Sequence, residues 1–401
     1  MSEKISKDML TELYAVKHKT DKEIAEEYGL HKQTIYNLRK KYDIKKIQKY
    51  ERFDLEFSQF QEQVIRGTIM GDGHLTNSSG RRSNLEIKHS ISVYDQSDYI
   101  RWLYFCLRNL CKNGPHLCKN GSHLCKNDTQ LRIRTHHHPW FDKLRKEFYN
   151  EDGTKIITRS ILNKLSPLSI AVWYMDDGGL QGTGSAKLST HNFTFLENVV
   201  IKEWFEEKYN IYPKIQKDGP YFWIRFNQAN ASKFWRLIDK YIIPSMQYKI
   251  GDRLENKLAY LAGAMEMVPD EGEAWRREYS KELSKMGIRC IIPNDEEQDI
   301  KRNINMKLLK SKDIDQYVFI MRDFIRADLT FIEASDFFIT RWEGEISAGT
   351  MGEATFAFRM EKPSFLISSL PCEEIPGWFL ACFTKKFSTL KELLTFLKEN
   401  K

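Results

Sequence analysis

The chain has 401 residues, of which 41% are hydrophobic and 13% are aromatic, as in folded globular proteins and unlike disordered ones. It is too long for one compact core, so we expect two or three domains. No run of apolar residues approaches the roughly 18 that a membrane span needs, and the first residues lack the apolar stretch of a signal peptide. The sequence therefore predicts an intracellular, cytoplasmic protein.

Positive charge is concentrated in the first two-thirds of the chain. Residues 1–255 contain 41 Lys and Arg against 31 Asp and Glu, whereas residues 256–401 contain 21 against 24. This imbalance suggests that a polyanion binds the first part, although an ordinary solvated surface would also fit. The seven cysteines are an odd number without a secretory context, which argues against a disulfide framework.

Residues 6–47 predict a small helical unit at the N-terminus. Thr20 or Asp21 is suited to cap one helix, Gly29 is suited to end it in a left-handed turn, and a basic helix follows. A helix, a turn and a basic helix form the helix-turn-helix pattern, although plain helical hairpins share it. We therefore expect a DNA-binding domain over 1–50, with Lys and Arg side chains facing phosphates. The residues expected to face base edges are Gln33, Thr34 and Asn37.

Residues 51–255 alternate helical and strand-like segments in an order that repeats once. Strands are expected at 85–92, 131–136, 186–191, 212–217 and 221–226, and helices at 95–110, 139–149, 194–208 and 229–241. This is a loose internal duplication, with halves at about 51–160 and 161–255. The strands alternate apolar and polar side chains, so that one sheet face could pack on helices while the other reads a DNA groove. A half-exposed sheet with solvated charges would give the same pattern.

A seven-residue repeat, CKNGPHL followed by CKNGSHL, occupies residues 111–124 and continues as CKN. It places Cys111, Cys118 and Cys125 in register with His116 and His123. A zinc site is one interpretation, but zinc ligands within one knuckle usually lie two to four residues apart. The longer spacing favours a duplicated loop.

Two segments point most directly to chemistry. The first, IRGTIMGDG, ends in Asp72 and a glycine, and the second, IAVWYMDDG, ends in Asp177 and a glycine. Each is typical of an apolar helix that ends in an acid followed by a residue able to adopt a positive φ. The small residues Gly67 and Gly71, with Ala171 opposite, would let two such helices meet backbone to backbone.

Two carboxylates brought together repel each other, and divalent cations relieve that repulsion. Carboxylate oxygens suit Mg²⁺, and two metal ions about 4 Å apart can promote phosphodiester hydrolysis. For either motif alone, an ordinary cap or turn would explain the acid. Two copies about a hundred residues apart, each opening one half of a duplication, favour a site for Mg²⁺ or another divalent metal.

The two motifs resemble the LAGLIDADG motifs of single-chain homing endonucleases. The stretches LSPLSIAVWYMDDGGL, LSTHNFTFLEN and YIIPSMQYKIG are similar to intron-encoded members of that family, over residues 55–252. The resemblance implies a pseudo-symmetric αββαββα fold that lies along the DNA major groove and cuts both strands with a divalent metal. It implies that Asp72 and Asp177 bind the metal, that Asp176 does not, and that Lys249 is a catalytic basic residue.

The same resemblance suggests further residues at the DNA. Gln96, Lys187 and Arg225 are candidates for organising solvent or contacting DNA, and phosphate binding or surface solvation would explain them equally well. The residues expected to bind DNA from the strands are Arg132, Arg134, Lys187, Lys214 and Arg225. Because the chain contains both halves, a monomer would suffice to cut both strands.

From residue 256 the pattern changes to short apolar strands alternating with helices, which indicates a parallel α/β domain of flavodoxin-like type. The stretches YLAGAMEMVPDEGEAWRREYSKEL, SDFFI and GTMGEATFAFRMEKPSFLI are similar to nucleoside 2-deoxyribosyltransferase-like proteins. A loop at Gly263 could admit a nucleoside, and Gly349 and Thr350 could hold an anion or hydroxyl at a helix N-terminus. The resemblance implies that Glu353 is a nucleophile and that Asp336 orients the nucleoside.

This second resemblance has one departure, because the family often has an Asp before the Gly-Thr pair and here Ser347-Ala348 stands there. An active enzyme and an inactive relic therefore stay equally open. The chain begins Met1-Ser2-Glu3 and no His-Asn pair marks the join at 256, so we expect a fusion and not a splicing element.

The leading prediction is a site-specific endonuclease that binds double-stranded DNA and cuts both strands. One alternative is a nucleoside 2-deoxyribosyltransferase or nucleotide N-glycoside hydrolase carried by residues 256–401. The other is a non-cutting intron-splicing or nucleic-acid-binding protein.

Overall fold

The computed structural model describes most of the chain, in twelve stretches. They are 5–17, 19–44, 55–76, 82–91, 96–119, 129–182, 184–250, 257–265, 268–293, 295, 304–345 and 347–399. The domain boundaries expected at 50 and 255 lie outside the described residues. Within the described stretches, no helix is both long and apolar enough to cross a membrane.

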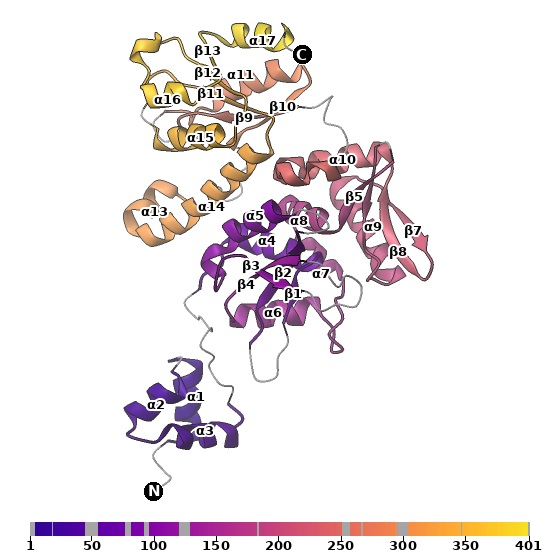
Figure 1. Ribbon diagram of the computed structural model, residues 1–401, viewed down its shortest axis with the longest axis vertical. Helices are drawn as coiled ribbons and strands as arrows, with labels where there is room; N and C mark the ends of the chain where they lie inside the picture. Colours follow the sequence, from indigo (N-terminus) through magenta and orange to yellow (C-terminus); the bar gives the residue numbers. More distant parts are fainter. Residues whose placement is uncertain are drawn as a thin grey trace.

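The N-terminal unit consists of three short helices around a small core of their own (Figure 1). These are α1 (Lys7–Ala15), α2 (Asp21–Glu27) and α3 (Lys32–Lys41). The expected helix start is confirmed, because Thr20 and Glu23 form a reciprocal capping box at α2. Gly29 has a φ of +60° between α2 and α3, as the turn required.

One expectation for this unit is wrong. Arg39 does not face outward toward phosphates, since it is only 6% exposed. Its Nε donates to Asp21 Oδ1 at 3.2 Å, and its Nη1 donates to the Ile44 carbonyl oxygen at 3.0 Å. Arg39 therefore joins α2 to α3, whereas Gln33, Thr34 and Asn37 are exposed on α3 as expected.

In its described residues, the first half of the central region contains four helical segments and four strands. They are α4 (Gln59–Met70), β1 (His74–Leu75), β2 (Leu85–Ser90), α5 (Ser97–Leu107), η1 (Arg108–Leu110), β3 (His116–Lys119), β4 (Thr129–Arg134) and α6 (Pro139–Phe148). The sheet is antiparallel, with the order β1-β2-β4-β3.

The second half repeats this plan. Its elements are α7 (Arg159–Asn163), α8 (Pro167–Asp177), β5 (Gly178–Gln181), β6 (Ser185–Leu188), α9 (Phe195–Tyr209), β7 (Lys214–Asp218), β8 (Tyr221–Phe226), α10 (Gln228–Ile238), η2 (Asp239–Tyr241) and η3 (Pro244–Lys249). The antiparallel order β5-β6-β8-β7 is the same as in the first half, so the expected duplication is confirmed. One continuous hydrophobic core joins both halves.

The repeat at 111–127 is not simply a loop, because its residues His116–Lys119 form β3 at the edge of the first sheet. Cys111 is buried, and the Cys118 thiol lies against the Gln130 carbonyl oxygen at 3.6 Å. His123 and Cys125 lie outside the described residues.

The C-terminal region is a parallel sheet covered by helices on both faces (Figure 1). Its elements are β9 (Lys257–Ala262), α11 (Glu273–Ser284), β10 (Ile288–Ile291), α13 (Met306–Lys312), α14 (Ile314–Ala334), β11 (Phe337–Arg341), α15 (Ala348–Arg359), β12 (Ser364–Ile367), η4 (Cys372–Glu374), α16 (Gly377–Ala381), β13 (Lys385–Phe387) and α17 (Leu390–Glu399). The order β10-β9-β11-β12-β13 is the flavodoxin-like order 2-1-3-4-5. The expected parallel α/β domain is confirmed.

The long helix α14 connects this domain to the central region. One side of α14 packs on the sheet through Phe331 and Ile332. On the other side, Asp323 Oδ2 accepts from the Phe60 amide at 3.3 Å, and the Trp102 indole donates to Thr330 Oγ1 at 3.3 Å. The parallel domain therefore packs against α4 and α5, behind the first sheet.

Candidate functional site

The two motif helices, α4 and α8, pack backbone to backbone, and glycine makes this possible. A Cβ added at Gly67 would lie 2.4 Å from the Ser169 carbonyl oxygen and 2.7 Å from Val172 Cβ. A Cβ at Gly71 would lie 2.4 Å from Asp176 Cβ. The close approach expected from these glycines is present, although it is made against these residues of α8 rather than against Ala171.

Three carboxylates gather where the two helices end. Asp72 follows α4, while Asp176 and Asp177 are the last two residues of α8. The Asp176 side chain is fully buried. Its Oδ2 accepts from the Asp72 amide at 3.1 Å, and its Oδ1 accepts from the Tyr99 hydroxyl at 2.7 Å. Asp176 therefore ties the end of one motif helix to the end of the other.

Burial and mutual repulsion perturb these acids. Burial, and next the negative charge of Asp72, raise the pKa of Asp177 to about 7. The same two causes, in the same order, raise the pKa of Asp176 well above its ordinary range. Carboxylates whose ionised forms are disfavoured in this way are good ligands for a cation, since the positive charge of the cation stabilises the ionised forms.

A lysine binds the end of each motif helix. Lys249 Nζ donates to the carbonyl oxygens of Met175 and Asp176 at the end of α8. Lys155 Nζ donates to the Gly71 carbonyl oxygen after α4, at 2.5 Å. Burial lowers the pKa of both lysines, and the nearby aspartates oppose that shift. These ammonium groups partly balance the carboxylates and complement the negative ends of the two helices.

Sequence reasoning named Lys249 but missed Lys155. A signal was present, because a Lys-Ile dipeptide stands after α6 in the first half (Lys155-Ile156) and after α10 in the second half (Lys249-Ile250). Aligning the two halves with each other would have found it.

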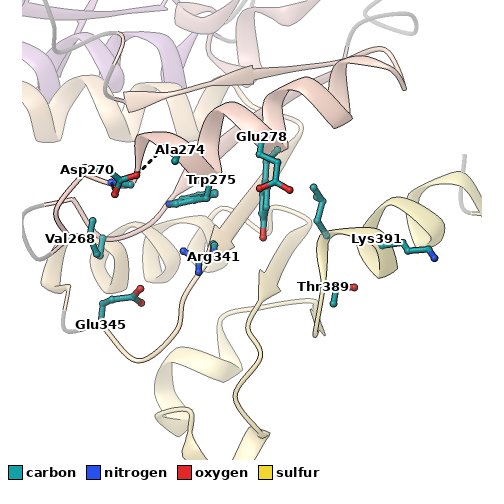
Figure 2. A pocket seen from close by; sticks show the side chains of 13 residues that line it. Val268, Asp270, Ala274, Trp275, Glu278, Arg341, Glu345, Thr389 and Lys391 are labelled. Carbon is teal, nitrogen blue, oxygen red and sulfur yellow. Dashed lines mark hydrogen bonds between the residues drawn. The ribbon is translucent and has the colours of Figure 1, made fainter.

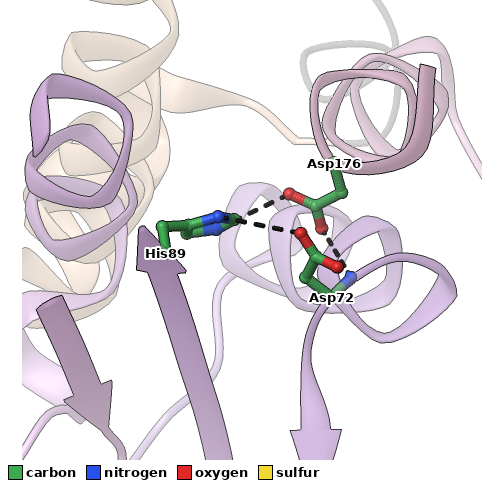
Figure 3. Close-up of side chains that lie close together, drawn as sticks. All are labelled: Asp72, His89 and Asp176. Atoms are coloured by element: carbon green, nitrogen blue, oxygen red, sulfur yellow. Dashed lines mark hydrogen bonds and ion pairs between the residues drawn. The ribbon is translucent and has the colours of Figure 1, made fainter. Parts of the chain in front are cut away.

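His89, on β2, completes the group and was also missed. It is 2% exposed. Its Nδ1 lies 3.2 Å from Gln96 Oε1 and 3.7 Å from Asp72 Oδ2, and its Nε2 lies 3.7 Å from Asp176 Oδ1. Figure 3 shows the imidazole facing both acids. One ligand atom from each of Asp72, His89 and Asp176 lies within 4.8 Å of the others, so the donor set suits a divalent cation.

Basic side chains form a row across each antiparallel sheet. In the first sheet the directly opposed residues are Lys88, Arg132 and His116, and in the second they are Lys187, Arg225 and Lys214. Their neighbours along the strands, such as Ile133 and Ile224, are buried in the core. Each row therefore lies on the sheet face away from the core. Arg134 lies on the same face, and both Arg134 and Lys88 are ion-paired with Glu86.

In the parallel domain the structure does not bring all the expected residues together. Asp336 precedes β11, and its Oδ2 accepts from the Leu258 amide at 2.7 Å, at the amino ends of β9 and β11. Gly263 follows β9 at the opposite, carboxyl end, where ligands bind in open α/β sheets. The expectation that Asp336 orients a nucleoside beside Gly263 is therefore wrong, because the length of the strand separates them.

Glu353 lies on α15 and its Oε1 accepts from the buried Tyr260 hydroxyl at 2.8 Å. Gly349 and Thr350 stand in the first turn of α15, as expected, but the Thr350 amide already donates to Ser347 Oγ at 3.3 Å. That amide is consequently committed to a cap and does not face a ligand.

A cavity of about 580 Å³ opens at the carboxyl edge of this sheet (Figure 2). Its walls include Trp275 and Tyr279 of α11, Arg341 at the end of β11, and Lys391 of α17. These helices cover the face opposite α15. Glu353 is not among the residues that line the cavity.

Comparison with known proteins identifies the central region. Residues 62–234 match the model of the LAGLIDADG DNA endonuclease family. Over 211 residues the chain is 27% identical to "Protein RecA" of Mycolicibacterium flavescens, covering 49% of this chain and 48% of that protein. Over 202 residues it is 29% identical to "Cytochrome b mRNA maturase bI2" of Saccharomyces cerevisiae, covering 48% of this chain and 47% of that protein.

The chain thus spans about half the length of these curated relatives. Among solved structures, the homing endonuclease I-WcaI bound to its DNA recognition sequence is 24% identical with a TM-score of 0.45, and the match covers 54% of this chain and 92% of that one. The family match over residues 62–234 contains most of α4, all of α8 and both antiparallel sheets. Residues 62–234 of this chain are therefore similar to the LAGLIDADG DNA endonuclease family.

Proposed function

We propose that the protein is a site-specific double-strand DNA endonuclease, with its centre at the ends of α4 and α8. The observation that carries this proposal is the convergence of Asp72, Asp176 and Asp177 at the point where the two closely packed motif helices end. Stable folding alone gives no reason to gather three acids there. One acid-tipped helix comes from each half, so the centre lies between the two sheets.

The nuclease chemistry needs a divalent cation that Asp72 and Asp177 help to hold. When bound, such a cation polarises the phosphate and lowers the pKa of a bound water. The chain's own contribution is positional: Gly67 and Gly71 set the helix spacing, and Lys155 and Lys249 fix the two helix ends. Lys249 then acts by positioning α8 and by balancing charge.

The rows of basic side chains on the two sheets provide the DNA-binding surface in this proposal. Arg132 stands in the middle of one row and Arg225 in the middle of the other. Phosphate contacts from such side chains fix position along DNA, while neighbouring polar residues read base edges. The exposed Gln33, Thr34 and Asn37 of α3 would add contacts outside the central site.

Plasmid cleavage tests the proposal directly. The protein is incubated with plasmids carrying candidate insertion sites, with Mg²⁺ or with EDTA. We expect linear product with Mg²⁺ only, and none from Asp72→Asn or Asp177→Asn. Binding of a short duplex by either variant should stay within a few-fold of wild type. Asp98→Asn, which alters an exposed aspartate of α5, is the matched control and should cut normally. Linear product from the double variant Asp72→Asn/Asp177→Asn would refute the assignment.

A non-cutting role in RNA splicing is the second candidate, and the maturase relatives favour it. It predicts that Asp72→Asn leaves function intact, because binding alone does not need that acid. An RNA splicing assay with the wild type and with Asp72→Asn separates the two roles.

Nucleoside chemistry in the parallel domain is a third candidate. The contact between Glu353 and Tyr260 is the observation that favours it. It predicts deoxyribosyl exchange or N-glycoside hydrolysis that Glu353→Ala abolishes, while plasmid cutting is unaffected.

A further inference from the structure

His89 is the one member of the acidic centre whose placement the described contacts leave unexplained. It comes from β2, it is 2% exposed, and its Nε2 has no hydrogen-bond partner among the described residues. Burying a polar atom without a partner is costly. The unpaired nitrogen faces Asp176 Oδ1 at 3.7 Å (Figure 3), which is too long for a hydrogen bond.

The other ring nitrogen indicates which atom is available. Nδ1 lies 3.2 Å from Gln96 Oε1, and an amide oxygen only accepts, so Nδ1 carries the hydrogen. Nε2 then presents its lone pair toward a carboxylate oxygen, which also presents lone pairs. Two acceptors that face each other in a buried site are stabilised by a positive ion between them. A ligating histidine commonly donates its other N–H to an oxygen acceptor in this way.

The carboxylates have free coordination capacity in the same direction. Asp176 uses one oxygen for the Asp72 amide and the other for the Tyr99 hydroxyl, and each carboxylate oxygen has a second lone pair. Asp72 has a side chain that is 47% exposed, so it can rotate toward the ion. The ligand atoms of all three residues lie within 4.8 Å of one another, and small side-chain rotations bring them within reach of one ion.

We propose that Asp72, Asp176 and His89 Nε2 together bind one divalent cation, and that the nitrogen ligand makes this a site for a first-row transition ion in preference to Mg²⁺. Imidazole nitrogen raises affinity for ions such as Co²⁺ and Zn²⁺, whereas an all-oxygen set suits Mg²⁺. Asp177 is not a ligand of this ion. It belongs to the part of the centre in which all the ligands are oxygen atoms.

The two halves differ at this position, which makes the metal centre asymmetric. The strand pairing of β1 with β2 can be compared with that of β5 with β6. When both pairings are continued along the chain, Thr190 in the second half occupies the position equivalent to His89 in the first half. Thr190 is also buried, but its hydroxyl donates to Asn198 Oδ1 at 2.5 Å. The second half therefore has no equivalent of the unpaired nitrogen, and the transition ion should bind on the side of the first half only.

This inference rests on the proposed function, because it names ligands and an ion class for the same centre, but its test needs no DNA cleavage. The metal-free full-length protein is titrated with Co²⁺, with Mn²⁺ and with Mg²⁺, without DNA. Visible absorption reports Co²⁺ binding, and pulsed electron paramagnetic resonance reports whether a nitrogen nucleus is coupled to bound Mn²⁺. We expect nitrogen coupling, and tighter binding of Co²⁺ than of Mg²⁺.

Variants assign the ligands. His89→Gln should lose the nitrogen coupling and weaken Co²⁺ binding by about 10-fold or more, while Mg²⁺ binding changes less. Asp176→Asn should weaken Co²⁺ binding as well, whereas Asp177→Asn should keep the coupling. His191→Gln, which alters a histidine outside this group, is the control. Unchanged coupling in His89→Gln would overturn the proposal.

If His89→Gln does not fold, wild-type protein labelled with ¹⁵N in its histidine rings still decides the question. The coupling should then change from a ¹⁴N to a ¹⁵N pattern, and a bound Mn²⁺ without any nitrogen coupling would overturn the proposal. A protein that binds Co²⁺ as described but does not cut DNA would refute the nuclease function and leave the metal site standing.

Discussion

Replacing Gly67 by alanine tests the helix packing on which the centre depends. The new Cβ would stand 2.4 Å from the Ser169 carbonyl oxygen, and ordinary contact begins at 3.4 Å. The backbone of α8 would therefore have to move by about 1 Å relative to α4. Such overpacking costs about 1–3 kcal/mol, and because the obstacle is backbone we expect the upper part of this range.

Alanine also has a better helix propensity than glycine, by about 1 kcal/mol, which offsets part of this cost. The net loss should be about 1–2 kcal/mol, equivalent to a fall in melting temperature of roughly 2–8 °C for a domain of this size. Circular dichroism melting, with tryptophan fluorescence as a second probe, measures it. Plasmid cutting should fall as well, because the shift separates the acids.

Gly352→Ala is the matched control for that experiment. Gly352 also lies inside a helix, α15, but an added Cβ would have no atom within 4 Å. Only the propensity gain applies, so the free energy of unfolding should rise by about 0.5–1 kcal/mol. If Gly67→Ala is as stable as the wild type or more so, while Gly352→Ala behaves as expected, the close contact between α4 and α8 is not present in solution.

Three further measurements follow from the electrostatics and burial. The pKa of Asp177 is raised to about 7 from 3.8, so the folded state holds this proton more tightly than the unfolded state. The metal-free protein should therefore lose stability as pH rises from about 4 to about 7. Asp177→Asn should flatten this slope, and an unchanged slope would contradict the assigned burial. Lys214→Ala should reduce the slope of log Kd for DNA against log salt concentration by about 1, and no change would remove Lys214 from the DNA-binding surface. Burial raises the pKa of Cys111 to about 12, whereas Cys372 is exposed. Iodoacetamide at pH 8 should therefore label Cys372 and spare Cys111, and peptide mass spectrometry measures both. Equal labelling of the two thiols would contradict the buried position of Cys111.

The sequence predicted the fold well where periodicity and capping are local. The capping box at Thr20, the turn at Gly29 and the two acid-tipped helices each follow from a few adjacent residues. The duplication was then inferred because the order of helices and strands repeats once along the chain. The short strand β13 and the helix α16 near the C-terminus were not predicted, because β13 has only three residues and α16 only five.

The site was predicted only in part, because several of its members depend on three-dimensional contacts. Asp72 and Asp177 were visible as ends of motifs. His89 lies on a strand seventeen residues after Asp72, and only the pairing of β1 with β2 brings it to the acids. Asp336 was misplaced for a related reason: the sequence shows that it borders a strand, but the parallel pairing of β9 with β11 decides which edge of the sheet it occupies.

The contact between α14 and the central region has a consequence for how the protein can be divided. Trp102, Tyr241 and Phe331 meet at this junction, where the Tyr241 and Phe331 rings are 5.4 Å apart and the Trp102 indole reaches Thr330. A chain ending near residue 255 would leave Trp102 and Tyr241 uncovered and the Phe60 amide without Asp323. Exposed aromatic surface of this kind promotes self-association. The truncated protein should therefore need a polar replacement at Trp102 before it stays monodisperse. In the full chain, the two parts that meet at this junction should melt in overlapping transitions.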